Sequence, residues 1–267
     1  MKYSSIFIVL LSFLCLPGSS QDHRTAEPYA GEQQLKKFIC QEMIYPETEL
    51  NARIEGTVLL TFLIDSAGDM NYVKIKESVS PGIDEEAERI LRKSIWLPAY
   101  KLGRPISTYV YYSVKFNIKK YNKNCRKRGY EEISYPFQPV DSSNHVYQRA
   151  DVSQAPKPVF NDPDQTVNKF IQKNLKYPEE AFSKDISGTV VLRFIVETNG
   201  KISHIVPEEP LGGGCTQEAS RIISLFNWMP GLQKGRAVRT MTTMSITFRL
   251  ADSQDLQYVP SGQNQGI

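Results

Sequence analysis

The chain contains an internal duplication, and this repeat limits its possible folds more than any other feature of the sequence. Shifted by 132 positions, residues 35–118 align with residues 167–250 without a gap. The matches fall on turn-forming and bulky residues: Tyr45, Gly56, Gly68, Trp96, Pro98 and Gly103 find Tyr177, Gly188, Gly200, Trp228, Pro230 and Gly235. Because glycine and proline mark turns and the ends of elements, matches over the full span predict two copies of one folded unit.

Each copy is predicted to begin with a short amphipathic helix and a β-hairpin. A Tyr-Pro pair ends the helix, because the residue before proline avoids the α conformation. The alternation that follows is typical of a strand with one buried face. Its apolar residues are Val58, Leu60, Phe62 and Ile64 in the first copy and Val190, Leu192, Phe194 and Val196 in the second. A glycine turn leads to a return strand over residues 70–77 or 201–206, and Pro207 and Pro210 are expected to shorten the second one.

A second helix and a closing strand complete each copy. We expect the helix to begin at Asp84 and at Thr216, whose side chains can accept hydrogen bonds from backbone N–H groups at a helix start. Alternating apolar residues then predict a third strand near residues 110–118 and 242–250. The order helix, strand, strand, helix, strand predicts an α+β fold of two tandem modules, each a three-stranded antiparallel sheet covered by two helices.

These patterns divide the chain into five parts. Residues 1–20 are interpreted as a signal peptide, residues 30–120 and 161–252 as the two modules, residues 121–160 as a linker and residues 253–267 as a flexible tail. Six basic residues between positions 119 and 128 are interpreted as part of a solvated linker. A basic patch for a membrane or a nucleic acid is the alternative, but the run lacks the helical or aromatic interleaving that such a patch needs.

The N-terminal segment has the pattern of an export signal. Lys2 precedes the apolar run 6–16, and small residues stand before Gln21. A run of about eleven residues is far short of the roughly 20 that span a bilayer, so we expect cleavage and a periplasmic protein. The alternatives are a retained segment that anchors the chain in the inner membrane and, as a minor one, lipidation at Cys15.

Composition and cysteine spacing exclude several kinds of partner. The formal net charge is only +3, so no protein-wide electrostatic attraction to nucleic acid is expected. After signal cleavage Cys40, Cys125 and Cys215 remain, and their wide spacing resembles no metal-ligand cluster. An odd number leaves at least one thiol unpaired within the chain, and if one disulfide forms we expect it between Cys40 and Cys125.

No catalytic, cofactor-binding or metal site is predicted. The three histidines, His23, His145 and His204, lie outside any recognisable catalytic motif. The glycine-rich stretch 211–215 lacks the Lys-Ser/Thr of a phosphate-binding loop, and the acidic residues near position 85 suit a helix N-terminus. The sequence therefore favours a binding protein over an enzyme, and an unrecognised hydrolase is the third-ranked class.

These motifs occur in both copies, and together they resemble the TonB C-terminal domain family. The pattern is Tyr-Pro-Glu, Ile-x-Gly-Thr-Val, an alternating strand, a turn glycine, a capped helix, Trp-x-Pro, Gly-Arg and a closing strand that ends in Phe-x-Ile/Leu. It covers about 168 of the 267 residues, and the approach to the second copy is similar to bacteroidete-type energy transducer relatives. The resemblance implies periplasmic modules that bind a short segment of outer-membrane transporters by strand addition.

By this resemblance the closing strand of each module forms the receptive edge, because an open sheet edge has unpaired backbone groups that accept another strand. The candidate binding residues are Thr108, Tyr109, Val110, Tyr111 and Tyr112 in the first copy and Thr240, Met241, Thr242, Thr243 and Met244 in the second. The outward residues Tyr109, Tyr111, Met241 and Thr243 would set selectivity. Tyr45, Trp96, Trp228, Gly56 and Gly188 are interpreted as structural rather than contacting residues.

Three functional readings follow. The leading one is a pair of periplasmic protein-binding modules without a membrane anchor of their own, whose two linked sites would raise the effective concentration at a partner. A membrane-anchored energy transducer is the alternative if residues 1–20 are retained, and a structural or homodimerising module that pairs by its edges is another. Because the two closing strands differ in sequence, we expect only one of the two edges to bind a given partner strongly.

Overall fold

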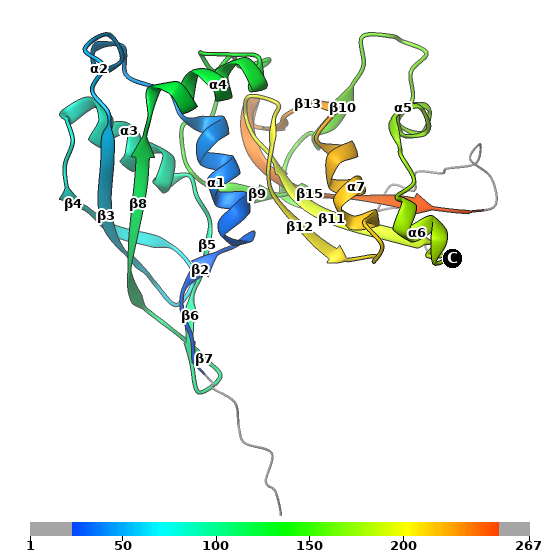
Figure 1. Ribbon diagram of the computed structural model, residues 1–267, viewed down its shortest axis with the longest axis horizontal. Helices are drawn as coiled ribbons and strands as arrows, with labels where there is room; N and C mark the ends of the chain where they lie inside the picture. Colours follow the sequence, from blue (N-terminus) through cyan, green and yellow to red (C-terminus); the bar gives the residue numbers. More distant parts are fainter. Residues whose placement is uncertain (1–22, 251–267) are drawn as a thin grey trace, which may run out of the picture.

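The computed structural model describes residues 23–250, which form two α+β modules packed side by side (Figure 1). The predicted signal peptide, residues 1–20, and the predicted tail, residues 253–267, lie outside the described residues. None of the helices within residues 23–250 combines the length and the apolar character needed to cross a bilayer.

The first module is built around an antiparallel sheet of order β4-β3-β8. Its inward side chains on β3 are fully buried beneath α1 and α3, as the alternation predicts. The elements in chain order are β1 (His23–Arg24), β2 (Glu27–Pro28), α1 (Gly31–Glu42), α2 (Glu47–Asn51), β3 (Gly56–Ile64), β4 (Met70–Glu77), α3 (Pro81–Arg92), β5 (Trp96–Leu97), β6 (Ala99–Lys101), β7 (Arg104–Ile106), β8 (Thr108–Phe116) and α4 (Ile118–Arg128).

The second module repeats this plan with the order β12-β11-β15 and a short β14 beyond. Two short elements, β9 (Val146–Gln148) and the 3₁₀ turn η1 (Arg149–Asp151), precede it. Its elements are β10 (Lys157–Val159), α5 (Val167–Asn174), α6 (Glu179–Ser183), β11 (Gly188–Val196), β12 (Ile202–Glu209), α7 (Cys215–Ile223), β13 (Asn227–Met229), β14 (Gly231–Gln233) and β15 (Arg236–Phe248). The predicted α+β class and the tandem pair of sheet modules are confirmed.

Equivalent contacts hold the same turn in both modules. The Tyr45 hydroxyl donates a hydrogen bond to the carbonyl of Ile54 at 2.5 Å, and the Tyr177 hydroxyl donates to the carbonyl of Ile186 at 2.6 Å. Each bond spans the short helix α2 or α6 and ties the Tyr-Pro turn to the start of the first long strand. These tyrosines are therefore structural residues, in agreement with the interpretation from the sequence.

The hairpin glycines also repeat. Gly68 and Gly200 adopt positive φ angles of 93° and 75°. A Cβ atom at Gly68 would lie 2.7 Å from the carbonyl oxygen of Trp96, and one at Gly200 would lie 2.5 Å from that of Trp228. Both conditions require glycine, so the turn between the first two strands of each module is fixed by backbone sterics.

Two expectations about element ends were wrong. Strand β12 is not shortened by proline: it continues to Glu209, and Pro207 lies in register with Leu192. Proline is tolerated there because β12 is an edge strand, so no second strand needs its missing N–H. Helix α3 begins before Asp84, and its N-cap is Ser80, whose hydroxyl accepts a hydrogen bond from the Ile83 N–H at 3.4 Å.

The second helix of the other module likewise begins earlier than expected. Its N-cap position is Gly214, not Thr216. The Thr216 hydroxyl instead bonds to both backbone groups of Leu211 at 2.8 Å, and Asp84 similarly accepts from the Val79 N–H at 3.0 Å. These two side chains hold the loop before the helix rather than the first free N–H groups of the helix.

The first part of the predicted solvated linker is a helix of the first module. Residues 118–128 form α4, which begins with the Asn117 side chain as N-cap and ends at Gly129 in the left-handed conformation. Tyr121 and Cys125 are buried against the first core. The Arg128 guanidinium donates to the carbonyls of Cys40, Gln41 and Met43 at 3.2, 2.8 and 2.8 Å, so α4 is fastened to the C-terminal end of α1.

The two modules share a buried junction in which α1 lies between the two sheets (Figure 1). Phe38 of α1 belongs to the first core, and its ring also contacts the ring of His204 on β12 at 4.7 Å between centroids. The residues Ile202–Ile205 are consequently buried on both sides of the second sheet. The modules therefore form one packed unit rather than two independent domains joined by a flexible linker.

Candidate protein-binding edges

The closing strand of the first module is an open edge. Strand β8 pairs with β3 along its whole length, from Thr108 opposite Ile64 to Phe116 opposite Gly56, and no other described strand pairs with it. Tyr109 and Tyr111 point outward and are 62% and 63% exposed. The other backbone edge of β8 is thus available to an incoming strand, and exposed aromatic side chains flank it.

The remaining candidate residues of this strand face inward. Thr108, Val110 and Tyr112 are half-buried, and the last two pack against the first core. The Tyr112 hydroxyl donates a hydrogen bond to the Glu32 carboxylate at 3.1 Å, and burial, with a further contribution from Glu32, raises the pKa of this tyrosine. These residues position the edge, whereas the two exposed tyrosines present it to solvent.

The equivalent edge of the second module is partly occupied by the chain itself. Strand β15 pairs with β11 on one side, and β9 adds to the other side as a short parallel strand, with Thr240 opposite Tyr147 and Met241 opposite Gln148. Backbone bonds between Ala237 and the segment at residues 139–141 extend this pairing. The connecting segment therefore supplies a short strand to the start of the predicted binding edge, at Thr240 and Met241.

The candidate residues on β15 are correspondingly more enclosed than those on β8. Thr240, Thr242 and Met244 are buried, while Met241 and Thr243 are half-buried. The two edges have the same position in their modules but different surroundings. The sequence predicted different edges from the side chains alone, whereas the structure adds a larger difference, because one edge already has a strand partner.

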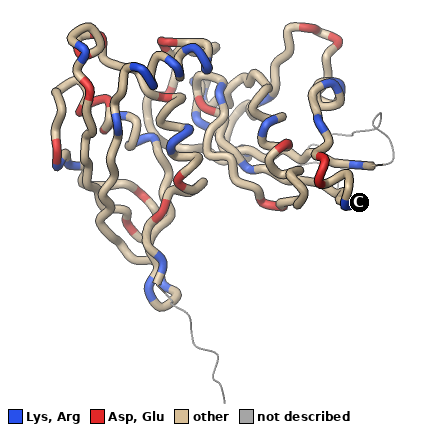
Figure 2. Tube along the Cα trace, viewed as in Figure 1, with Lys and Arg blue, Asp and Glu red and all other residues tan. Residues whose placement is uncertain are grey.

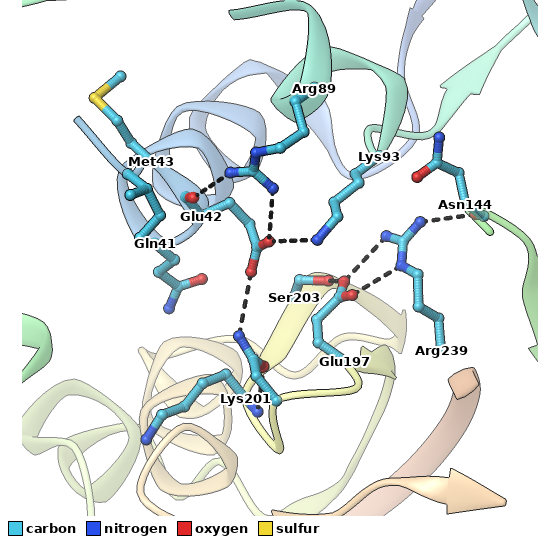
Figure 3. A network of polar contacts seen from close by, with 12 residues as sticks. Gln41, Glu42, Met43, Arg89, Lys93, Asn144, Glu197, Lys201, Ser203 and Arg239 are labelled. Carbon is cyan, nitrogen blue, oxygen red and sulfur yellow. Dashed lines mark hydrogen bonds and ion pairs between the residues drawn. The ribbon is translucent and has the colours of Figure 1, made fainter. Parts of the chain in front are cut away.

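A buried ion pair fixes the segment that carries β9 (Figure 3). The Arg239 guanidinium meets the Glu197 carboxylate through two hydrogen bonds of 2.8 and 3.0 Å, and both side chains are at most 5% exposed. The same guanidinium donates to the carbonyl of Asn144 at 2.9 Å, just before β9 begins. Burial opposes ionisation of Glu197, yet the charge and hydrogen bonds of Arg239 hold its pKa below the usual range.

Ser203 and His204 complete this buried network. The Ser203 hydroxyl lies 2.5 Å from Glu197 Oε1 and 2.7 Å from His204 Nδ1. Burial lowers the pKa of His204 to about 4; the Glu197 carboxylate opposes this effect and the nearby Arg239 guanidinium adds to it. The imidazole is therefore neutral at neutral pH, and its ring packs against Phe38 at the junction between the modules.

A second set of contacts joins the modules across the same junction (Figure 3). Glu42 of α1 accepts from Lys93 at 2.9 Å and from the side-chain amide of Asn199 at 3.3 Å. Glu42 is 3% exposed, so these partners satisfy a carboxylate that is withdrawn from water. The turn of the second module is thereby held against the end of α1.

A groove lies beside the open edge of the first module, between α1 and α4. Its floor is apolar and includes Ile39, Met43, Val114 and Tyr121, and it runs along Tyr112–Lys115 of β8. A continuation of the groove toward the end of α4 is lined by lysines of both helices. This groove could not be predicted from the sequence, because the lysine-rich residues of α4 favour a solvated linker and the docking of α4 on α1 depends on contacts between distant residues.

The three described cysteines are free thiols. Cys40 is half-buried, while Cys125 and Cys215 are buried. The sequence favoured Cys40 and Cys125 as the pair if one disulfide formed, and this disulfide is absent. Cys40 lies on α1 and Cys125 on α4, the two helices that Arg128 joins. Within residues 23–250, no group of three or more histidine, cysteine or acidic side chains is placed to hold a metal ion.

Comparison with known proteins identifies both modules. The family model of the Gram-negative bacterial TonB protein C-terminal domain matches residues 41–118 and 173–250, which together are more than half of the chain. No curated protein matches the sequence. Domains of this family are non-catalytic, periplasmic protein-interaction modules. The chain therefore belongs to the TonB C-terminal domain family and contains two copies of that domain in tandem.

Proposed function

We propose that this protein is a periplasmic binding module pair that takes up an extended segment of an envelope protein by strand addition at β8. A TonB-dependent outer-membrane transporter is the partner that fits the family. The observation that carries the proposal is the contrast between the two equivalent edges: β8 is open along its length, whereas residues 239–241 of β15 already pair with β9. The first module would bind the external segment, and the second would keep its own strand.

Strand addition suits the chemistry of β8. Its outer N–H and C=O groups can form ladder hydrogen bonds with any extended chain, which provides affinity without regard to sequence. Alternate side chains of the added strand would lie beside Tyr109 and Tyr111 on the outer face of the sheet. Aromatic side chains next to a cross-strand neighbour contribute selectivity through packing.

The second module supports the same mode of binding. Residues 146–148 of this chain lie on the corresponding edge of β15 as a parallel strand. The fold thus accommodates an additional strand at this position without rearranging its core. The segment is held in place by the Asn144 contact to Arg239, so an external ligand would have to displace a tethered competitor.

The direct test is the binding of a fluorescent peptide that spans the N-terminal periplasmic segment of a TonB-dependent transporter from the same bacterium. Two N-methylated versions serve as matched controls, because alternate residues of a strand direct their N–H groups to opposite neighbours. One version removes the donors that face β8, and the other removes the donors that face solvent. We expect one version to bind at least about tenfold more weakly than the other.

Other outcomes would separate the alternatives. Equal binding of the two N-methylated peptides, or no binding of the parent peptide, would contradict strand addition at β8. A concentration-dependent dimer in analytical ultracentrifugation that the peptide does not dissociate would favour the homodimerising module. Recovery of the intact Met1 terminus from the inner membrane would favour the anchored energy transducer.

A further inference from the structure

We infer that the groove between α1 and α4 receives acidic side chains of the segment that adds to β8, so the partner of this protein carries a short acidic stretch beside its strand-forming residues. This inference rests on the proposed function, because it concerns the same bound segment. It goes further by stating the chemistry of that segment, and it depends on α4, which the family match at residues 41–118 barely reaches.

The position of the groove connects it to the edge. Residues Tyr112–Lys115 of β8 form one wall of the groove, with α1 and α4 on either side. Alternate side chains of a strand point to opposite faces of a sheet. An added strand would therefore place every second side chain on the inner face, at the mouth of this groove, while the others lie beside Tyr111 on the outer face.

The charge of the groove determines which side chains fit. Its rim contains Lys36 and Lys120, and the continuation adds Lys37 and Lys127. Figure 2 shows the Lys and Arg positions along α4 above those of α1. No aspartate or glutamate lines either part of the groove.

Little within the described residues neutralises these cations. Among these four lysines, Lys36 alone has an ion-pair partner within residues 23–250, which is Glu32 at 3.2 Å. Burial, and then the charge of Lys127, lowers the pKa of Lys37, so the two helices bring like charges together. A carboxylate between them would relieve this repulsion and find several donors.

A peptide explains the groove better than a lipid surface or a nucleic acid does. The basic residues line a concave channel with an apolar floor formed by Ile39, Met43 and Tyr121, and this channel opens directly onto an unpaired strand edge. A flat bilayer would not reach the floor of such a channel. An extended peptide satisfies the strand edge, the apolar floor and the lysine rim at the same time.

The experiment uses the chain that begins after the predicted signal peptide and short synthetic peptides with one shared Thr-Val repeat. Each peptide carries either an Asp-Glu-Asp or an Asn-Gln-Asn flank, placed at the N-terminal or the C-terminal end to cover both strand directions. We expect one acidic peptide to bind about threefold to tenfold more tightly than its neutral match, and high salt to remove most of the difference.

Matched variants locate the effect. The double variant Lys120→Gln/Lys127→Gln should lose the preference for the acidic peptide and bind the neutral peptide as the wild type does. The control Lys74→Gln/Lys76→Gln removes the same charge from exposed positions on β4, at the opposite edge of the sheet, and should keep the preference. Thermal unfolding of both variants verifies that they are folded.

The outcomes distinguish this inference from the proposed function. If both flanks bind equally and N-methylation still weakens binding, the acidic groove is wrong and strand addition stands. If the acidic peptides bind through Lys120 and Lys127 but N-methylation has no effect, strand addition fails and the inference that one segment occupies both sites fails with it. Lysine-dependent sedimentation with phosphatidylglycerol vesicles, without discrimination between the peptides, would also overturn the inference.

Discussion

Tyr72 and His204 occupy equivalent positions in the two modules and share one backbone conformation, with φ angles of 50° and 51°. Both lie where the pairing of the return strand shifts register against the first strand. Yet Tyr72 is 70% exposed and His204 is 3% exposed. Duplication has preserved the bulge, and the second copy uses it to bury an imidazole against α1 of the first copy.

The burial of His204 predicts a loss of stability in mild acid. Its pKa is about 4 in the folded protein and near 6.5 when the chain is unfolded, so below pH 6.5 the unfolded state binds a proton that the folded state does not. The contribution of neutral His204 to the free energy of unfolding is fully present above pH 6.5. It falls by about 3 kcal/mol as the pH drops toward 4. Urea unfolding at several pH values should show this decline.

The His204→Phe variant is the control for this pH dependence. It removes the titrating group and keeps an aromatic ring beside Phe38. Its free energy of unfolding should change less between pH 7 and pH 5 than that of the wild type, while the titration of Glu197 and other carboxylates remains at lower pH. The same slope for both proteins over this interval would show that His204 is not the responsible group.

The buried pair of Glu197 and Arg239 predicts a large and asymmetric effect of substitution. Arg239→Met leaves a carboxylate without its partner at a site withdrawn from water and should cost about 3–5 kcal/mol of unfolding free energy. The double variant Glu197→Leu/Arg239→Met removes both charges and should recover much of that loss. Chemical denaturation of the three proteins measures both effects.

An exposed pair provides the comparison for that experiment. Lys184 and Glu180 form a surface ion pair, so Lys184→Ala should change the free energy of unfolding far less than Arg239→Met does. A loss for Arg239→Met no larger than this would mean that water reaches the pair at the junction. A double variant as unstable as Arg239→Met would mean that packing, not the unpaired charge, dominates.

The duplicated glycines offer a test of backbone sterics in both modules at once. Gly68→Ala and Gly200→Ala should each cost more than about 2 kcal/mol, because a Cβ would meet a tryptophan carbonyl and the φ angle is positive. Gly103→Ala and Gly235→Ala share positive φ but meet no atom within 4 Å, so they should cost only about 1 kcal/mol. Thermal unfolding that ranks the two pairs equally would contradict this reasoning.

The free cysteines predict a graded reactivity. Half-buried Cys40 should be alkylated by iodoacetamide in the native protein, whereas buried Cys125 and Cys215 should react only on unfolding, and burial also raises the pKa of Cys215. Arg128→Met removes the bonds that fasten α4 to α1 and should expose Cys125 without affecting Cys215. Mass spectrometry of the alkylated peptides measures the reactivity of each cysteine. A disulfide between Cys40 and Cys125 in the native protein would contradict this prediction.

The sequence predicted what depends on local patterns. The alternation of Val58 to Ile64, the turn at Gly200 and the repeated Trp-x-Pro each specify an element through sterics or periodicity within a few residues. The helix starts near Asp84 and Thr216 were misplaced because both side chains bond to the preceding loop rather than cap the helix. A hydroxyl or carboxylate can do either, and only its neighbours decide.

The features that distinguish the two modules depend on distant contacts and could not be predicted in this way. Residues 146–148 have no sequence pattern that identifies them as the partner of β15. The lysine-rich α4 has too few apolar residues for its packing against α1 to be predicted. Its burial depends on Arg128, which reaches three carbonyls more than eighty positions away. The family resemblance located the candidate edge strands, but only the structure shows which of the two edges is accessible to another strand.

Hydrogen–deuterium exchange with and without the transporter peptide tests the central claim most directly. In the free protein, the edge of β15 next to β9 should already be protected over residues 239–241, whereas peptide fragments covering β8 should retain fast-exchanging amides. We expect the peptide to protect β8 and to leave β15 and β9 unchanged. Protection at β15 with release of β9, and none at β8, would contradict the assignment of the binding edge to the first module.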